Sequence, residues 1–119
     1  MQEAIDQFVN ELKSTEEAGN FYAARKAFEK DDVARDLMTR LNTMTYELSR
    51  KQHENKLEES ELELYRDVQK EFRTNDTVAA LEQSENTFTE LLKECNAAIS
   101  EEIKMDFAAQ VAPAQCGCG

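Results

Sequence analysis

Cys116 and Cys118, separated by a single glycine, are the residues whose type and spacing best suit chemistry. Thiolates bind soft metals and iron–sulfur clusters, and neighbouring glycines let the backbone bend so that both sulfurs face one ion. A structural zinc ion or a cubane cluster usually takes four protein ligands. We therefore expect Cys116 and Cys118 to supply half of a metal site, with the other ligands coming from another chain. The alternative is an unstructured tail that carries two inert thiols.

The third cysteine and the single histidine do not extend this site. Cys95 lies between Leu92 and Ile99 on an apolar helical stripe, and free cysteine packs as a small hydrophobe. We expect Cys95 to be a core residue, with the role of a third metal ligand as the alternative. His53 falls near the end of a predicted helix, where a positive charge is favourable. Catalysis or metal binding by His53 is the less simple interpretation.

Enzymatic machinery is not evident from the remaining residues. One histidine and three glycines, two of them in the tail, assemble no nucleophile–histidine pair and no glycine-rich phosphate loop. Adjacent carboxylates such as Glu58 and Glu59 are frequent because the chain is acidic, so they carry little catalytic signal. We predict that the protein is not an enzyme, and a hydrolase that uses clustered carboxylates is the alternative.

Composition predicts a thin core and no direct nucleic-acid ligand. Of the 119 residues, 40% are hydrophobic, below the roughly 45–50% typical of globular chains. A thin core favours burial against a partner, so we expect a homodimer or a higher homo-oligomer. The 25 acidic residues exceed the 14 basic ones and leave a net charge of −11, which repels phosphate. Charged residues interrupt the N-terminal segment, and no apolar run approaches the roughly 20 residues of a membrane span. We therefore expect a soluble, cytoplasmic protein that is not membrane-bound.

Apolar residues at spacings of three and four predict about five helices. Short stripes start with Ile5 and with Phe21, and a longer one runs from residue 33 to about His53. The polar segment 54–59 then reverses the chain, so a fourth helix with its apolar face at residues 62–72 lies antiparallel to the third. The longest stripe runs from Val78 to Ile103.

Capping residues mark the breaks between these helices. Ser14 with Glu17 and Ser60 with Glu63 have the form of capping boxes, and the segments 30–32 and 74–77 read as a break and a turn with fresh caps. The fold class is thus all-α, with two long antiparallel helices forming a hairpin and shorter N-terminal helices. We predict one helical domain over residues 1–107 and a flexible, cysteine-containing tail over residues 108–119. Met38 and Met44, with nearby aromatic residues, are expected to be ordinary core, and a groove for a partner helix is the alternative.

Three segments in this order resemble the YlbF/YmcA family. They are residues 8–17 (FVNELKSTEE), residues 28–37 (FEKDDVARDL) and residues 73–78 (RTNDTV) followed by Glu82 and Glu85. The cysteine-bearing end strengthens the resemblance, which covers nearly the whole chain. It implies a small, self-associating all-α protein without catalytic activity.

The same resemblance implies a regulatory or accessory role. Two members of the family form a cytoplasmic complex with a third, unrelated protein, carry iron–sulfur clusters and support mRNA processing by RNase Y. Carried onto this sequence, the role of ligand to a [4Fe-4S] cluster shared between chains falls on Cys116 and Cys118, with zinc as the alternative metal. Family paralogues and an RNase Y-type ribonuclease are the implied partners.

We therefore predict a helical adaptor that acts through self-association and partner binding. The alternative is a purely structural association module with an inert tail, and deletion of residues 112–119 would distinguish the two.

Overall fold

The computed structural model describes residues 1–111, which form an all-helical chain. Within this range there is no strand, and the helices are α1 (Gln2–Lys13), α2 (Glu16–Lys30), α3 (Asp32–His53), α4 (Glu59–Thr74), α5 (Asp76–Ile103) and α6 (Phe107–Val111). The predicted fold class is confirmed, including the antiparallel hairpin of α3 and α4.

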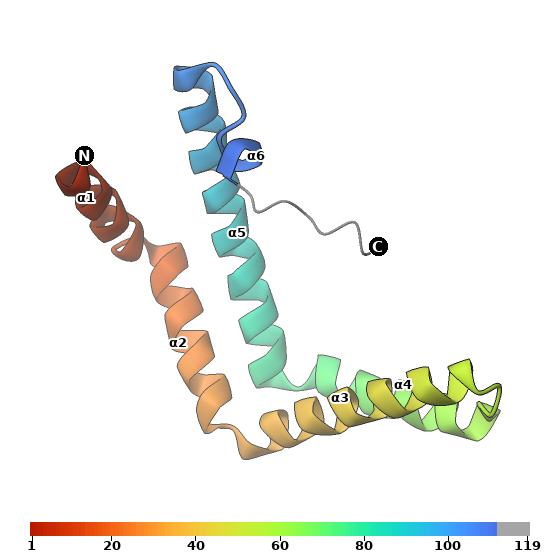
Figure 1. The fold of residues 1–119 in the computed structure, drawn as a ribbon. Helices are drawn as coiled ribbons and strands as arrows, with labels where there is room; N and C mark the ends of the chain where they lie inside the picture. Colours follow the sequence, from red (N-terminus) through yellow and green to blue (C-terminus); the bar gives the residue numbers. More distant parts are fainter. Residues whose placement is uncertain (112–119) are drawn as a thin grey trace.

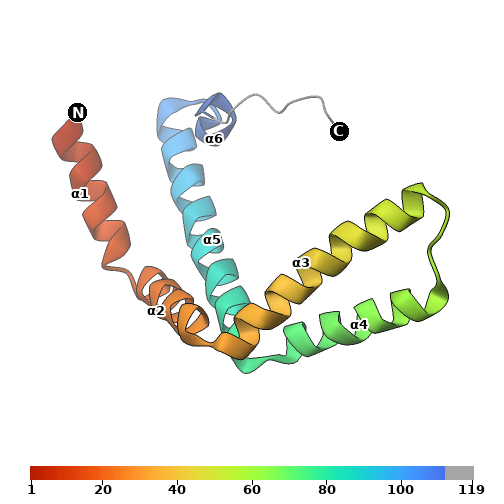
Figure 2. The same cartoon turned by 60° about the horizontal axis from the view of Figure 1, so that its bottom comes forward.

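The helices form two arms that meet at a sharp elbow (Figure 1). One arm contains α2 packed along α5, with α1 continuing beyond α2 and α6 folded back on the far end of α5. The other arm is the α3–α4 hairpin, which closes through the turn of residues 54–58 (Figure 2). The chain therefore passes the elbow twice, once from α2 to α3 and once from α4 to α5.

Both passages at the elbow are fixed by side-chain caps. Asp31 accepts a hydrogen bond from the Ala34 amide at 3.0 Å and begins α3, while the Asn75 side chain accepts from the Thr77 and Val78 amides and begins α5. These bonds satisfy amides that have no partner in the first turn of a helix.

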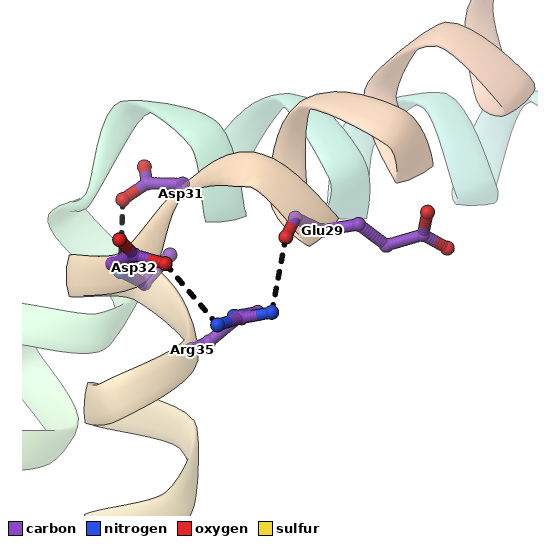
Figure 3. Close-up of polar contacts among 5 residues, drawn as sticks. Glu29, Asp31, Asp32 and Arg35 are labelled. Atoms are coloured by element: carbon purple, nitrogen blue, oxygen red, sulfur yellow. Dashed lines mark hydrogen bonds and ion pairs between the residues drawn. The ribbon is translucent and has the colours of Figure 1, made fainter.

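Arg35 adds a second tie at the same corner (Figure 3). Its guanidinium donates to the Glu29 carbonyl oxygen at 3.2 Å and to the Asp32 carboxylate at 3.1 Å. It thereby joins the last turn of α2 to the first turn of α3. The abrupt change of direction is thus specified by local polar contacts.

Full burial is almost confined to this elbow. Among the described residues the buried hydrophobic side chains are Ala18, Ala34, Leu37, Val68 and Val78, and the last four belong to the turns nearest the elbow or to α4 behind it. Along the arms, the apolar residues between the paired helices are only half-buried, as at Leu41, Met44 and Leu48. Each of these helices packs against a single neighbouring helix, which covers its apolar face from one direction only. The expectation of a thin core is met.

Two predicted helix starts are wrong by one or two residues. Helix α2 is capped by Thr15, whose Oγ1 accepts from the Ala18 amide at 3.2 Å, in place of Ser14. Helix α4 begins after Glu58, whose amide donates to Glu61 Oε2 at 3.4 Å, in place of Ser60. At the first start Thr15 offers a hydroxyl equivalent to that of Ser14, and at the second Glu58 and Glu61 form the capping box in place of Ser60 and Glu63.

The chain continues as a helix past residue 107, the predicted end of the domain. Lys104 ends α5 in the left-handed conformation, with φ 60°, and the chain turns back there. The amides of Phe107 and Ala108 then donate to Ser100 Oγ at 2.9 Å and to Asn96 Oδ1 at 3.0 Å. These bonds dock α6 on α5, so residues 108–111 belong to the folded part described here. The predicted domain boundary otherwise stays a prediction.

Candidate interaction surfaces

The predicted ligands Cys116 and Cys118 lie outside the described residues. Within residues 1–111, no group of three or more His, Cys, Asp or Glu side chains is placed to hold a metal ion. Two thiolates alone fit half of a zinc or iron–sulfur site. The assignment of Cys116 and Cys118 as ligands therefore stays a prediction.

Cys95 lies in a groove at the free end of the first arm, which we call the arm-end groove. It has a volume of about 260 Å³ and is lined by residues of α1, α5 and α6: Phe8, Leu92, Cys95, Asn96, Ile99, Phe107, Ala108 and Val111. Cys95 is half-buried among mostly apolar side chains, as expected for a packed free thiol. Phe8 and Leu92 remain 43% and 40% exposed, so this end of the arm is only partly covered.

His53 is the last residue of α3, in a turn that also contains Arg50 and Lys51. Its position at the helix end is as expected and suits a cation, because unpaired carbonyl groups face that terminus. The same turn precedes the hairpin loop, in which Asn55 takes a positive φ of 57°.

An aromatic cluster joins α2 to α5. The rings of Phe21 and Phe88 stack with centroids 5.6 Å apart, and Tyr22 lies within 6.4 Å of Phe88 by the same measure. The guanidinium carbon of Arg25 lies 5.7 Å from the centre of the Phe21 ring. The two phenylalanines are half-buried and pack across the seam of the first arm, so they act as core here. Met38 does not, because it is 44% exposed.

The hairpin arm carries a different groove on each side of its seam. The first, which we call the uncharged groove, has a volume of about 270 Å³ and contains no Asp, Glu, Lys, Arg or His side chain. It is lined by Thr45, Leu48, Ser49, Gln52, Leu57, Leu62 and Tyr65. The Thr45 hydroxyl donates to the Tyr65 hydroxyl oxygen at 3.3 Å, which links α3 to α4 across this groove. Charged residues make up 33% of the chain, so their absence from a surface groove is a specific local feature.

The charged groove lies on the other side of the seam and is lined by Met44, Glu47, Leu48, Lys51, Glu61 and Leu64. The Lys51 ammonium donates to the Glu61 carboxylate and closes this side of the hairpin. This hydrogen bond raises the pKa of Lys51 and lowers the pKa of Glu61 from their ordinary values. The ion pair is partly exposed, so it positions the two helices more than it stabilises them.

Large apolar side chains remain exposed along both arms. Between 40% and 73% of the surface is exposed at each of five of them: Ile5, Tyr22, Tyr46, Leu64 and Ile103. The accessible surface is 9549 Å², against about 6,600 Å² expected for a compact monomer of this mass. The radius of gyration is 19.5 Å, against about 13.5 Å for a compact domain of this length. A single chain therefore exposes more total surface than a compact domain would, and the exposed residues include these large apolar side chains.

Within residues 1–111 the chain is an all-helical protein whose distinguishing feature is a set of exposed apolar side chains. The sequence matches the family described as control of competence regulator ComK, YlbF/YmcA, over residues 1–104. The chain belongs to this family, as its motifs suggested. No curated protein and no solved structure matched the chain. Within residues 1–111 no helix is long and apolar enough to cross a membrane.

The sequence suggested a groove near Met38 and Met44 only as an alternative, and Met44 does line the charged groove. It gave no indication of the uncharged groove or of the arm-end groove. The grooves arise where two or three helices meet side by side, so a periodic pattern within one helix does not show them. One available signal was the run of uncharged residues at positions 38, 41, 42, 45, 49 and 52, which share one side of α3.

Proposed function

We propose that this protein is a non-enzymatic regulatory adaptor that acts by self-association and by binding other proteins. The observation that supports this most directly is the exposed apolar surface of an open, two-armed chain. Surfaces of this kind on a stable protein mark sites for protein partners. Membership of a family that controls a competence regulator supports a regulatory role.

We further propose that Cys116 and Cys118 supply two thiolates of a [4Fe-4S] cluster shared between chains, with zinc as the alternative metal. Family resemblance supports iron–sulfur, and the donor chemistry of two thiolates accommodates either metal. The implied partners are family paralogues and an RNase Y-type ribonuclease, so the regulated process would be mRNA processing. With 25 acidic against 14 basic residues, the chain would act there without holding RNA itself.

Co-purification of two differently tagged copies from the native host tests this function. We expect the second tagged copy, together with a family paralogue or the ribonuclease, to elute with the first under anaerobic conditions. Recovery of the first copy alone would contradict the proposal.

The alternative is a structural association module with an inert tail. A chain that lacks residues 112–119 separates the two, because an inert tail predicts unchanged partners and an unchanged cellular role. Loss of the ribonuclease from the purified complex, with the copies still associated, would favour a working tail.

A further inference from the structure

The side chains that line the uncharged groove form a surface suited to a second copy of this chain. We propose that two copies pair face to face through their uncharged grooves, so that two α3–α4 hairpins complete a four-helix bundle. This inference rests on the proposed self-association and names the surface that would carry it.

The first observation that supports this pairing is the incomplete burial of the α3–α4 hairpin. Leu48, Leu62 and Tyr65 sit on the seam between α3 and α4, yet all three are only half-buried. Two antiparallel helices cannot enclose their shared seam, because each helix covers the other from one direction only. A second pair of helices laid across the seam encloses it, which is the arrangement of four-helix bundles.

The distribution of charge favours the α3–α4 hairpin, and not the arm that contains α5, as the surface for pairing with an identical chain. In α5, seven residues are acidic and one is basic. In α3, three are acidic and four basic, and in α4 five are acidic and three basic. Two copies that meet through α5 would bring strongly negative helices together, whereas the hairpins are nearly neutral. Cores of protein interfaces are also depleted in charge, and the uncharged groove has that property.

The size of the face is adequate for a dimer. The 16 residues of α4 rise about 24 Å and two adjacent helices are about 20 Å wide. Two such faces bury about 1,000 Å² in total, which is at the lower limit for a specific interface. The dimer should therefore be one of moderate affinity. Other exposed apolar residues, including those of the arm-end groove, stay available to different partners.

A matched pair of substitutions tests the surface. Thr45 lines the uncharged groove, whereas Thr43 lies two positions earlier on a different side of α3 and lines neither hairpin groove; both are exposed. We expect Thr45→Glu to weaken dimerisation at least roughly tenfold in sedimentation equilibrium, because pairing would bury a new charge in each copy. Thr43→Glu should leave the dimer unchanged.

Ser49→Glu provides a second variant in the same groove, and circular dichroism reports whether each variant keeps its helices. Weakening by Thr45→Glu or Ser49→Glu in a folded protein, with Thr43→Glu unaffected, supports the proposal. A wild-type dimer that tolerates both groove variants as well as Thr43→Glu overturns this surface but leaves self-association standing. A wild-type chain that stays monomeric overturns self-association itself, and with it this proposal.

Discussion

The rings of Phe21 in α2 and Phe88 in α5 stack with their centroids 5.6 Å apart and their planes inclined by 23°. This contact joins residues that are far apart in the sequence and holds the first arm together. Since both rings are half-buried, Phe88→Ala should lower the free energy of unfolding by about 2 kcal/mol, less than the loss at a fully buried site. Urea denaturation at one fixed protein concentration measures the change.

Tyr46→Ala is the control for the aromatic contact. Tyr46 is 73% exposed on the other arm, so its removal should change stability by less than about 0.5 kcal/mol. If Phe88→Ala is as mild as Tyr46→Ala, the two helices of the first arm do not depend on the stack.

Gly19 offers a stabilising substitution. It lies inside α2, and a Cβ added there meets no atom within 4 Å. Gly19→Ala should therefore raise the unfolding free energy by about 0.5–1 kcal/mol, because alanine loses less backbone entropy in a helix. The reverse change at an exposed alanine of the same helix, Ala23→Gly, should cost a similar amount. Destabilisation by Gly19→Ala would mean that residue 19 is not helical.

Asp31 should make the elbow sensitive to acid. Hydrogen bonds from the Ala34 amide and, secondarily, from the Thr77 side chain hold the pKa of Asp31 below its ordinary value of 3.8. A carboxylate whose pKa is lower in the folded state stabilises the fold above its unfolded pKa, and that contribution is lost as the pH falls through the folded pKa. Stability of the wild type should thus fall on acidification below about pH 4.

Asp31→Asn isolates this effect because asparagine also caps helices but does not titrate. Thermal melts of both proteins between neutral pH and pH 2 should show that the difference in melting temperature shrinks as the pH falls. A difference that is constant over this range would show that the ionisation of Asp31 does not contribute to stability.

The tail cysteines should control metal content. Protein purified anaerobically should contain iron and acid-labile sulfide, with the visible absorbance of a cluster, and Cys116→Ser combined with Cys118→Ser should remove both components. Cys95→Ser is the matched control, since Cys95 packs in the arm-end groove and should not affect iron content. Colourless, metal-free wild-type protein that retains its partners would refute the cluster, whereas zinc in place of iron would identify the alternative metal.

The helices and their order were predictable because their apolar stripes are regular. Helix α3, from Asp32 to His53, contains apolar residues spaced three or four positions apart, a spacing that places them on one side of a helix: Val33, Leu37, Leu41, Met44 and Leu48. The breaks at Asp31 and Asn75 were predictable for a similar reason, because short polar side chains cap helices through local bonds. The exact starts were not, because Thr15 carries the same hydroxyl as Ser14 and because the pair Glu58 and Glu61 can form a capping box as well as Ser60 and Glu63.

The contacts between helices that are distant in the sequence were harder to predict from the sequence. The pairing of α2 with α5 depends on contacts such as Phe21 with Phe88, which no local pattern encodes. The docking of α6 depends on Asn96 and Ser100, polar residues whose role appears only when the chain turns back at Lys104. The predicted site itself, Cys116 and Cys118, remains a prediction because both residues lie outside the described part of the chain.

Sedimentation equilibrium of the untagged full chain over a wide concentration range shows whether the protein associates through its exposed apolar faces. We expect a particle of at least twice the chain mass of 13.6 kDa that dissociates on dilution. A mass of 13.6 kDa at every concentration, with a radius of gyration by X-ray scattering near the roughly 13.5 Å of a compact domain, would contradict it.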